Sequence, residues 1–162
     1  RYTVRWGDLD VNRHLANSSY FDFFTDTRIR FLNTQGVTQE VFAEHQVGPV
    51  ILNESIHYFR EVKGGEQVYV DLECGGISDN GTFFIFKQHM YNAKGEISAY
   101  LELLAAWFSI ASRKLIAPPE LIAKAVRAVP QSADFRALKK EDTRRVGKEV
   151  LMRSLPAEFL GK

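Results

Sequence analysis

Two aspartates, an asparagine and a histidine lie close together near the start of the chain, at Asp8, Asp10, Asn12 and His14. A carboxylate can act as a base or nucleophile, an amide can orient water, and an imidazole can relay a proton. The segment leads into an apolar stretch that predicts a helix, whose free N-terminal N–H groups favour developing negative charge. This combination could polarise a carbonyl group and activate water.

Each of these residues also has an interpretation without chemistry. Asp10 could merely cap the turn that follows it, and Asn12 could be a turn residue that tolerates an unusual backbone angle. His14 could be structural, and a structural role is the one we expect for Asp8. Residue types and spacing alone leave these alternatives open.

The hydrophobic pattern predicts the elements that must position this segment. Residues 2–6 alternate as a short strand, and residues 19–34 carry mostly aromatic positions at helical spacing. Asn17 or Ser18 is the expected N-cap of this helix, and Gly36 follows its end. Because the helix is so aromatic, we expect much of its circumference to be buried.

The second half of the chain is predominantly of strand period. The predicted strands span residues 50–60, 67–75, 82–91 and 96–110, and short helices are expected at residues 38–44 and 118–130. In the first of these strands Val50, Leu52, Ile56 and Tyr58 should share one face. Tight turns between the strands predict an α+β fold, with an antiparallel sheet of about five strands packed on the aromatic helix.

Bulk composition narrows the class of protein. The 162 residues suggest one domain over residues 1–130, followed by a peripheral, partly helical tail over residues 131–162. The net charge of +1 gives no reason to expect nucleic-acid binding, and no apolar run is long enough to span a membrane. Cys74 is the only cysteine, which fits a cytoplasmic protein. The four histidines lack metal-ligand spacing, so we expect neither a metal nor a cofactor.

The segment from Asp8 to Tyr20 resembles the signature of the acyl thioesterases of the hotdog fold, which include 4-hydroxybenzoyl-CoA thioesterase-like and acyl-ACP thioesterases. Asp10-x-Asn12-x-His14 is most similar to the acyl-ACP branch. Tyr58-Phe59-Arg60-Glu61 resembles that branch's Tyr-Arg-Arg-Glu segment. The resemblance covers residues 1–128, and it departs at Ala16, where many relatives carry an asparagine.

The resemblance implies a sheet wrapped around one long buried helix and hydrolysis of an acyl-CoA or acyl-ACP without a cofactor. Asp10 would be the base or nucleophile, assisted by Asn12, His14 and Glu61. The expected substrate-binding residues are Asn17, Ser18, Ser19 and Tyr20 at the helix start, and Arg60, Lys63, Arg113 and Lys114 for the phosphates of coenzyme A.

Hotdog domains pair edge to edge, so the resemblance implies a homodimer with the active site at its interface, and two dimers often form a tetramer. Two other functions stay open. One is a hotdog hydratase or dehydratase acting on an enoyl thioester, and the other is a module that binds acyl-CoA without cleaving it.

Overall fold

The computed structural model describes residues 1–143. Its helices are α1 (Asn17–Thr34), α2 (Gln39–His45) and α3 (Glu120–Arg127), with short 3-10 helices η1 (Trp6–Asp8) and η2 (Lys140–Thr143). Its strands are β1 (Tyr2–Thr3), β2 (Val47–Tyr58), β3 (Gln67–Val70), β4 (Glu73–Ser78), β5 (Phe83–Tyr91), β6 (Ile97–Ser109), β7 (Lys114–Leu115) and β8 (Gln131–Leu138). None of the helices within this part of the chain is both long and apolar enough to cross a lipid bilayer.

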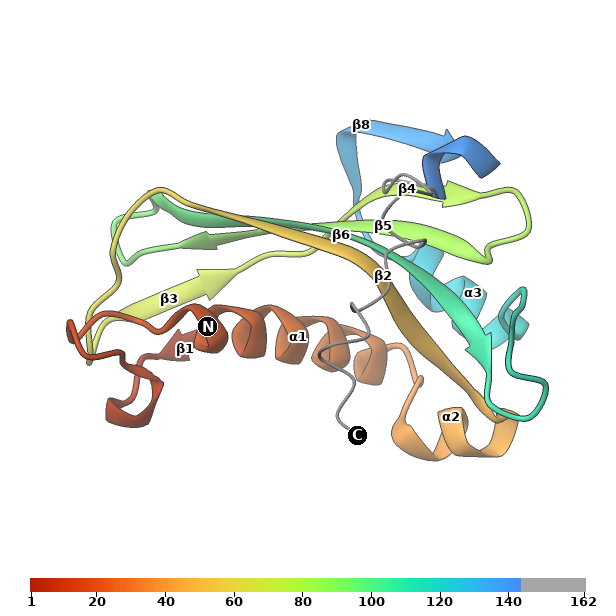
Figure 1. Cartoon of the computed structure of the whole chain (residues 1–162), viewed down its shortest axis with the longest axis horizontal. Coiled ribbons are helices and arrows are strands. Elements are labelled where there is room, and N and C mark those ends of the chain that lie inside the picture. Colours follow the sequence, from red (N-terminus) through yellow and green to blue (C-terminus); the bar gives the residue numbers. More distant parts are fainter. Residues whose placement is uncertain (144–162) are drawn as a thin grey trace, which may run out of the picture.

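The strands form one strongly curved sheet that arches over α1 (Figure 1). Antiparallel pairing joins β2 to β6 and β6 to β5, and β5 then pairs with both β3 and β4. Strand β2 forms one edge of the sheet, and the opposite edge is formed by β1, next to β3, and β8, next to β4. This is the α+β hotdog arrangement, which confirms the expected fold class.

Helix α1 packs one side against the sheet. Its buried residues include Tyr20, Phe23, Phe24 and Leu32, which join the main core cluster with inward-facing side chains of the sheet such as Leu103. Ser18, Asp22, Thr25 and Ile29 are exposed. The helix is therefore less buried in the single chain than its aromatic content predicts.

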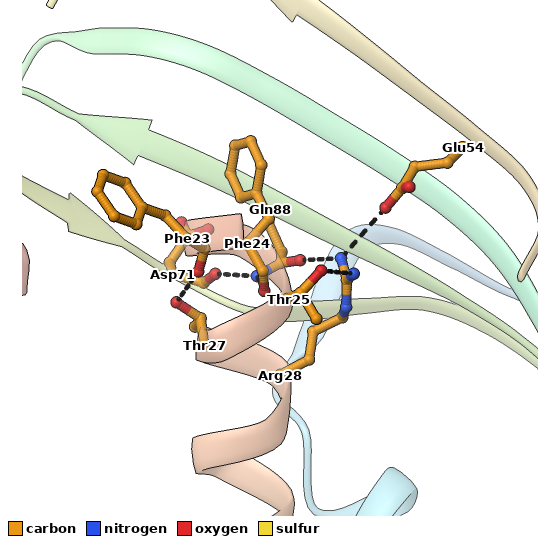
Figure 2. A network of polar contacts seen from close by, with 8 residues as sticks. All are labelled: Phe23, Phe24, Thr25, Thr27, Arg28, Glu54, Asp71 and Gln88. Carbon is orange, nitrogen blue, oxygen red and sulfur yellow. Dashed lines mark hydrogen bonds and ion pairs between the residues drawn. The ribbon is translucent and has the colours of Figure 1, made fainter. Parts of the chain in front are cut away.

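A polar network lies within this helix–sheet interface. The buried guanidinium of Arg28 donates to Gln88 Oε1 at 2.8 Å and to Thr25 Oγ1 at 2.7 Å, and lies 3.4 Å from Glu54 Oε1 (Figure 2). Gln88, which is fully buried, donates in turn to the carbonyl oxygens of Phe24 and Asp71. Burial lowers the pKa of Arg28, although the side chain stays charged at any physiological pH. The network ties the helix to β2 and β5 through directional bonds.

The structure corrects two predictions about strands. The stretch 67–75 is interrupted at residues 71–72, which separate β3 from β4. Both strands pair with β5 in one register, but the neighbour on their other side passes from β1 to β8. Val50 does not share a face with Ile56 and Tyr58, because a bulge near Leu52 adds one residue to β2. Val50 pairs with Ala106 whereas Ile56 pairs with Leu101, and these two partners lie on opposite faces of β6.

The first part of the expected tail is a strand. Residues 131–138 form β8, which pairs in parallel with β4 and so belongs to the sheet. Leu138 packs with Ile85 and Leu104 in a small second cluster on the outer face of the sheet. A 3-10 turn follows at η2, and residues 144–162 lie outside the described part of the chain.

Candidate active site

The loop between η1 and α1 is built around the carboxylate of Asp10. Its Oδ1 accepts the backbone N–H of Asn12 at 2.8 Å and of His14 at 3.1 Å. Backbone bonds from Asp10 N to His14 O and from Arg13 N to Asp10 O close the turn. Asp10 therefore does cap the turn, but these bonds use only one of its carboxylate oxygens, and the residue is exposed.

Both ends of this loop are fixed to the fold. Asp8 is buried and accepts bonds from the backbone N–H, Nε and Nη2 of Arg5, and these bonds lower the pKa of the Asp8 carboxyl. The carbonyl of Asp8 accepts the N–H of Ala16, and Leu15 donates to the carbonyl of Val62. Asp8 thus has a structural role, and the loop is held against residues 61–63.

The second sequence match meets the first at this point. His14 Nε2 lies 3.1 Å from Glu61 Oε2, and the other oxygen of Glu61 lies 3.1 Å from Lys63 Nζ. A β-bridge between His14 and Lys63 holds the two segments in register. The hydrogen bond from Lys63, with added attraction from His14, lowers the pKa of Glu61, which keeps this carboxylate ionised.

A pocket of about 410 Å³ joins these groups. It is lined by Asp10, His14, Leu15, Asn17, Tyr20, Tyr58, Phe59, Arg60 and Glu61. Two carboxylates, an imidazole and the start of α1 therefore surround one cavity with aromatic walls. Asn12, although in the same loop, lines a different cavity and is not part of this wall.

The start of α1 borders this pocket through Asn17. The N–H of Ser18 donates to Asn17 Oδ1, and that of Ser19 donates to the carbonyl of Ala16. Of the three N–H groups at residues 17–19, that of Asn17 alone has no acceptor within residues 1–143. The helix begins after Ala16, so Asn17 is its first residue and not the N-cap. Ser18 and Ser19 do not line the pocket.

Tyrosines form one wall of the pocket. The rings of Tyr20 and Tyr58 meet edge to face with centroids 5.1 Å apart. Burial raises the pKa of Tyr20 to about 12, with smaller contributions from Tyr58 and the carboxylate of Asp10. Tyr20 is therefore a neutral phenol that can donate a hydrogen bond but cannot act as a base at neutral pH.

The predicted phosphate ligands are not all near this pocket. Arg60 lines it, but its guanidinium donates to the carbonyl of Ile97 at 2.7 Å. Arg113 and Lys114 lie next to Ser109, whereas the pocket lies at the Tyr58 end of β2. The two ends of this strand are roughly 35 Å apart along its length. Within one chain, Arg113 and Lys114 therefore cannot contact a substrate whose thioester lies in the pocket.

Tyr58 and Phe59 belong to the pocket wall although the sequence did not mark them as substrate-binding residues. Both are strongly exposed for aromatic side chains. The sequence feature that could have identified them is their position directly before Arg60 and Glu61 in the second motif. Across residues 1–143, no three His, Cys, Asp or Glu side chains converge in a way that could hold a metal ion.

Solved structures with the same fold were found by comparison. SAV2348 from Staphylococcus aureus, in complex with CoA, has a TM-score of 0.73 at 17% identity, over 96% of this chain and 92% of that one. Slr0204 from Synechocystis, a 1,4-dihydroxy-2-naphthoyl-CoA thioesterase, has a TM-score of 0.71 at 14% identity, and the match covers 78% of this chain and 93% of that one. The gentisyl-coenzyme A thioesterase BH1999 has a TM-score of 0.67 at 16% identity, and the match covers 77% of this chain and 96% of that one. At these identities the likeness shows a shared fold.

Sequence comparison gives the family. No curated protein matches the chain closely enough to count as a relative. The profile of the thioesterase-like superfamily matches residues 4–126, which include the loop at Asp10, all of α1 and the segment at Glu61. Because this match covers most of the chain and both halves of the candidate site, the chain belongs to the thioesterase-like superfamily.

Proposed function

We propose that the chain hydrolyses an acyl thioester to a free acid and a thiol, with coenzyme A as the carrier. The observation that carries the proposal is the convergence of Asp10, His14 and Glu61 with the start of α1 around one pocket. Membership in the thioesterase-like superfamily supports the reaction type. Two neighbours in fold are named as thioesterases of aromatic acyl-CoAs, which supports coenzyme A and favours testing aromatic acyl groups first.

In this mechanism Asp10 is the base. Its Oδ1 is fixed by two backbone N–H groups, so Oδ2 is the oxygen that takes a proton from water as that water attacks the carbonyl carbon. Attack on the carbon by Oδ2 itself, followed by hydrolysis of the resulting anhydride, uses the same geometry. His14, oriented by Glu61, supplies a proton to the departing sulfur as the carbon–sulfur bond breaks.

The charge that develops on the carbonyl oxygen needs a donor. The N–H of Asn17 has no acceptor among the described residues, lies at the positive end of an 18-residue helix, and belongs to a residue that lines the pocket. We therefore assign Asn17 N–H to this oxygen. Tyr20 serves as a wall of the acyl site.

The pocket is completed by a second copy of the chain in this proposal. Within residues 1–143, strand β2 pairs with β6 on one side only, and Tyr58 lies at its end beside the pocket. Ile51, Leu52 and Tyr58 are each exposed by more than two fifths along this edge. Antiparallel pairing of β2 with its counterpart would cover these side chains and place the two pockets on the dimer interface.

The test is thiol release from short, long and aromatic acyl-CoAs by the wild type and by Asp10→Asn. Asparagine keeps an oxygen that can accept the N–H groups of Asn12 and His14, so the loop is preserved while the base is lost. We expect kcat/KM to fall about a hundredfold, the scale of a lost general base. Asp79→Asn, an exposed hairpin aspartate, is the matched control.

Equal rates for the wild type and Asp10→Asn would remove Asp10 from the mechanism. Water addition to an enoyl-CoA without thiol release would show the hydratase instead. Binding of acyl-CoA without turnover of any substrate would show a binding module.

A further inference from the structure

A second and larger cavity, of about 720 Å³, borders the same loop and shares His14 with the pocket that holds Asp10 and Glu61. It is lined by Val4, Trp6, Leu9, Asn12, Arg13, His14, Lys63, Gly64 and Gly65. Among the described residues, this lining contains an indole and two cationic side chains, and no carboxylate. A ligand that passes His14 could therefore occupy both cavities at once.

Trp6 gives this cavity an aromatic surface. Its side chain is 84% exposed, although its backbone is fixed within η1. Leu9 N–H donates to the carbonyl of Trp6, and the bonds between Arg5 and Asp8 close the turn around it. A large ring held out in water on a fixed backbone offers a flat face to a ligand without further ordering of the chain.

Two cationic side chains, those of Arg13 and Lys63, also line the cavity. Arg13 has a φ of 63°, a left-handed conformation that is uncommon for a non-glycine residue and that turns the chain at this point. It forms no ion pair with any residue of the described part of the chain. Lys63 is held next to His14 by the β-bridge. An anion in the cavity would meet two positive charges, one of them unpaired.

Two glycines keep the cavity open. A Cβ at Gly64 would lie 2.9 Å from Leu9 Cδ1, so a side chain there would displace a residue that lines the cavity. Gly65 has a φ of 82°, which favours glycine. The turn therefore keeps Lys63 beside the loop while contributing no side chain of its own at residues 64 and 65.

We propose that this second cavity binds the nucleotide end of coenzyme A, with the adenine on the face of Trp6 and the phosphates on Arg13 and Lys63. The proposal rests on the thioesterase function proposed above. It selects coenzyme A over an acyl carrier protein, because a carrier protein presents no purine to stack on the indole. The pantetheine arm runs past His14 into the pocket with Asp10.

The kinetic test compares one acyl group on two thiols, coenzyme A and pantetheine, which lacks the nucleotide. In Trp6→Ala we expect kcat/KM for the acyl-CoA to fall about tenfold through KM, within the range for loss of one stacking surface. The rate with acyl-pantetheine should not change. Trp6→Phe should restore most of the loss, and Arg13→Gln should raise KM for acyl-CoA alone.

Val11→Ala is the matched control, since this neighbouring side chain is 98% exposed and does not line the cavity. Equal losses with acyl-CoA and acyl-pantetheine, or no loss with either, would overturn the proposal. So would efficient hydrolysis of acyl-ACP that depends on Trp6 as strongly as hydrolysis of acyl-CoA.

A binding test separates this proposal from the reaction. The chain has two tryptophans, and Trp107 is only 1% exposed, so a nucleotide stacked on Trp6 should quench the solvent-exposed part of the fluorescence. The probe is adenosine 3′,5′-bisphosphate, and its binding should weaken as salt is raised. Binding that depends on Trp6, without turnover of any thioester, would keep this site and refute the thioesterase. Turnover of a thioester without nucleotide binding at Trp6 would support the thioesterase and refute this site.

Discussion

Removal of Glu54 should destabilise the protein because it leaves the charge of Arg28 in the helix–sheet interface without a counter-ion. Arg28 is 8% exposed, and its remaining partners would be the neutral side chains of Gln88 and Thr25. Breaking a fully buried ion pair costs about 3–5 kcal/mol. Here the contact is 3.4 Å long and Glu54 is partly hydrated, so we expect Glu54→Leu to lose about 2 kcal/mol.

The double variant decides whether the cost comes from the unpaired charge. In Arg28→Met with Glu54→Leu both charges are gone and aliphatic side chains fill similar space, so the loss should stay well below the sum of the two single losses. The remaining loss comes from the buried Oε1 of Gln88, which no longer has Arg28 as its donor. Gln88 would keep its bonds to the carbonyls of Phe24 and Asp71. The coupling between the two sites should then be favourable by more than about 1 kcal/mol.

The assay is urea denaturation of the wild type, the two single variants and the double variant, analysed as a thermodynamic cycle. Glu120→Gln is the control, because it breaks an exposed ion pair to Arg127 and should change stability by less than about 0.5 kcal/mol. A neutral Glu54→Leu, or single losses that simply add in the double variant, would refute the reasoning about the buried charge.

Three further outcomes are expected. Lys63→Gln removes the main cause of the lowered pKa of Glu61, so this pKa should rise. The acid limb of the pH profile of kcat/KM should then move to higher pH. An unchanged acid limb would mean that ionised Glu61 is not needed for the reaction. Gly76→Ala places a Cβ 2.7 Å from both the carbonyl oxygen of Arg136 and the side chain of Leu138. Urea denaturation should therefore show that the free energy of unfolding falls by about 1–3 kcal/mol. An unchanged free energy of unfolding would show that β8 can move away freely. Leu52→Lys puts a charge on the exposed edge of β2, so light scattering should find monomers with little thioesterase activity; an active dimer would place the interface elsewhere.

The sequence predicted the fold well where one local signal dominated. Helix α1 and strands β5 and β6 differ from their predicted bounds by a residue or two, because long periodic segments between glycine turns have few alternatives. The bulge at Leu52 was missed because one extra residue reverses the face of every later side chain without changing the composition. β8 was missed because Asp134 and Arg136 obscure its strand pattern.

Site prediction depended on which residues the fold brings together. His14 and Glu61 are 47 positions apart in the sequence, and only the motif resemblance placed both of them in the catalytic set. Arg113 and Lys114 were plausible because strand ends look alike in a sequence, whichever end of the sheet they occupy. Arg28 and Glu54 were missed because charged residues are normally assigned to the surface, and their burial depends on each other.

Strand β8 makes the two edges of the sheet differ in their tendency to pair with another chain. It covers the edge of β4 and presents charged side chains there, with Asp134 paired to Lys87 and Arg136 paired to Asp142. Such an edge discourages strand addition, whereas β2 presents apolar residues. In the proposed dimer, pairing of β2 with β2 would occupy the free edge of each copy, so association would stop at a closed two-fold pair. The same sheet without β8 would expose a second edge and could extend from copy to copy as a fibre.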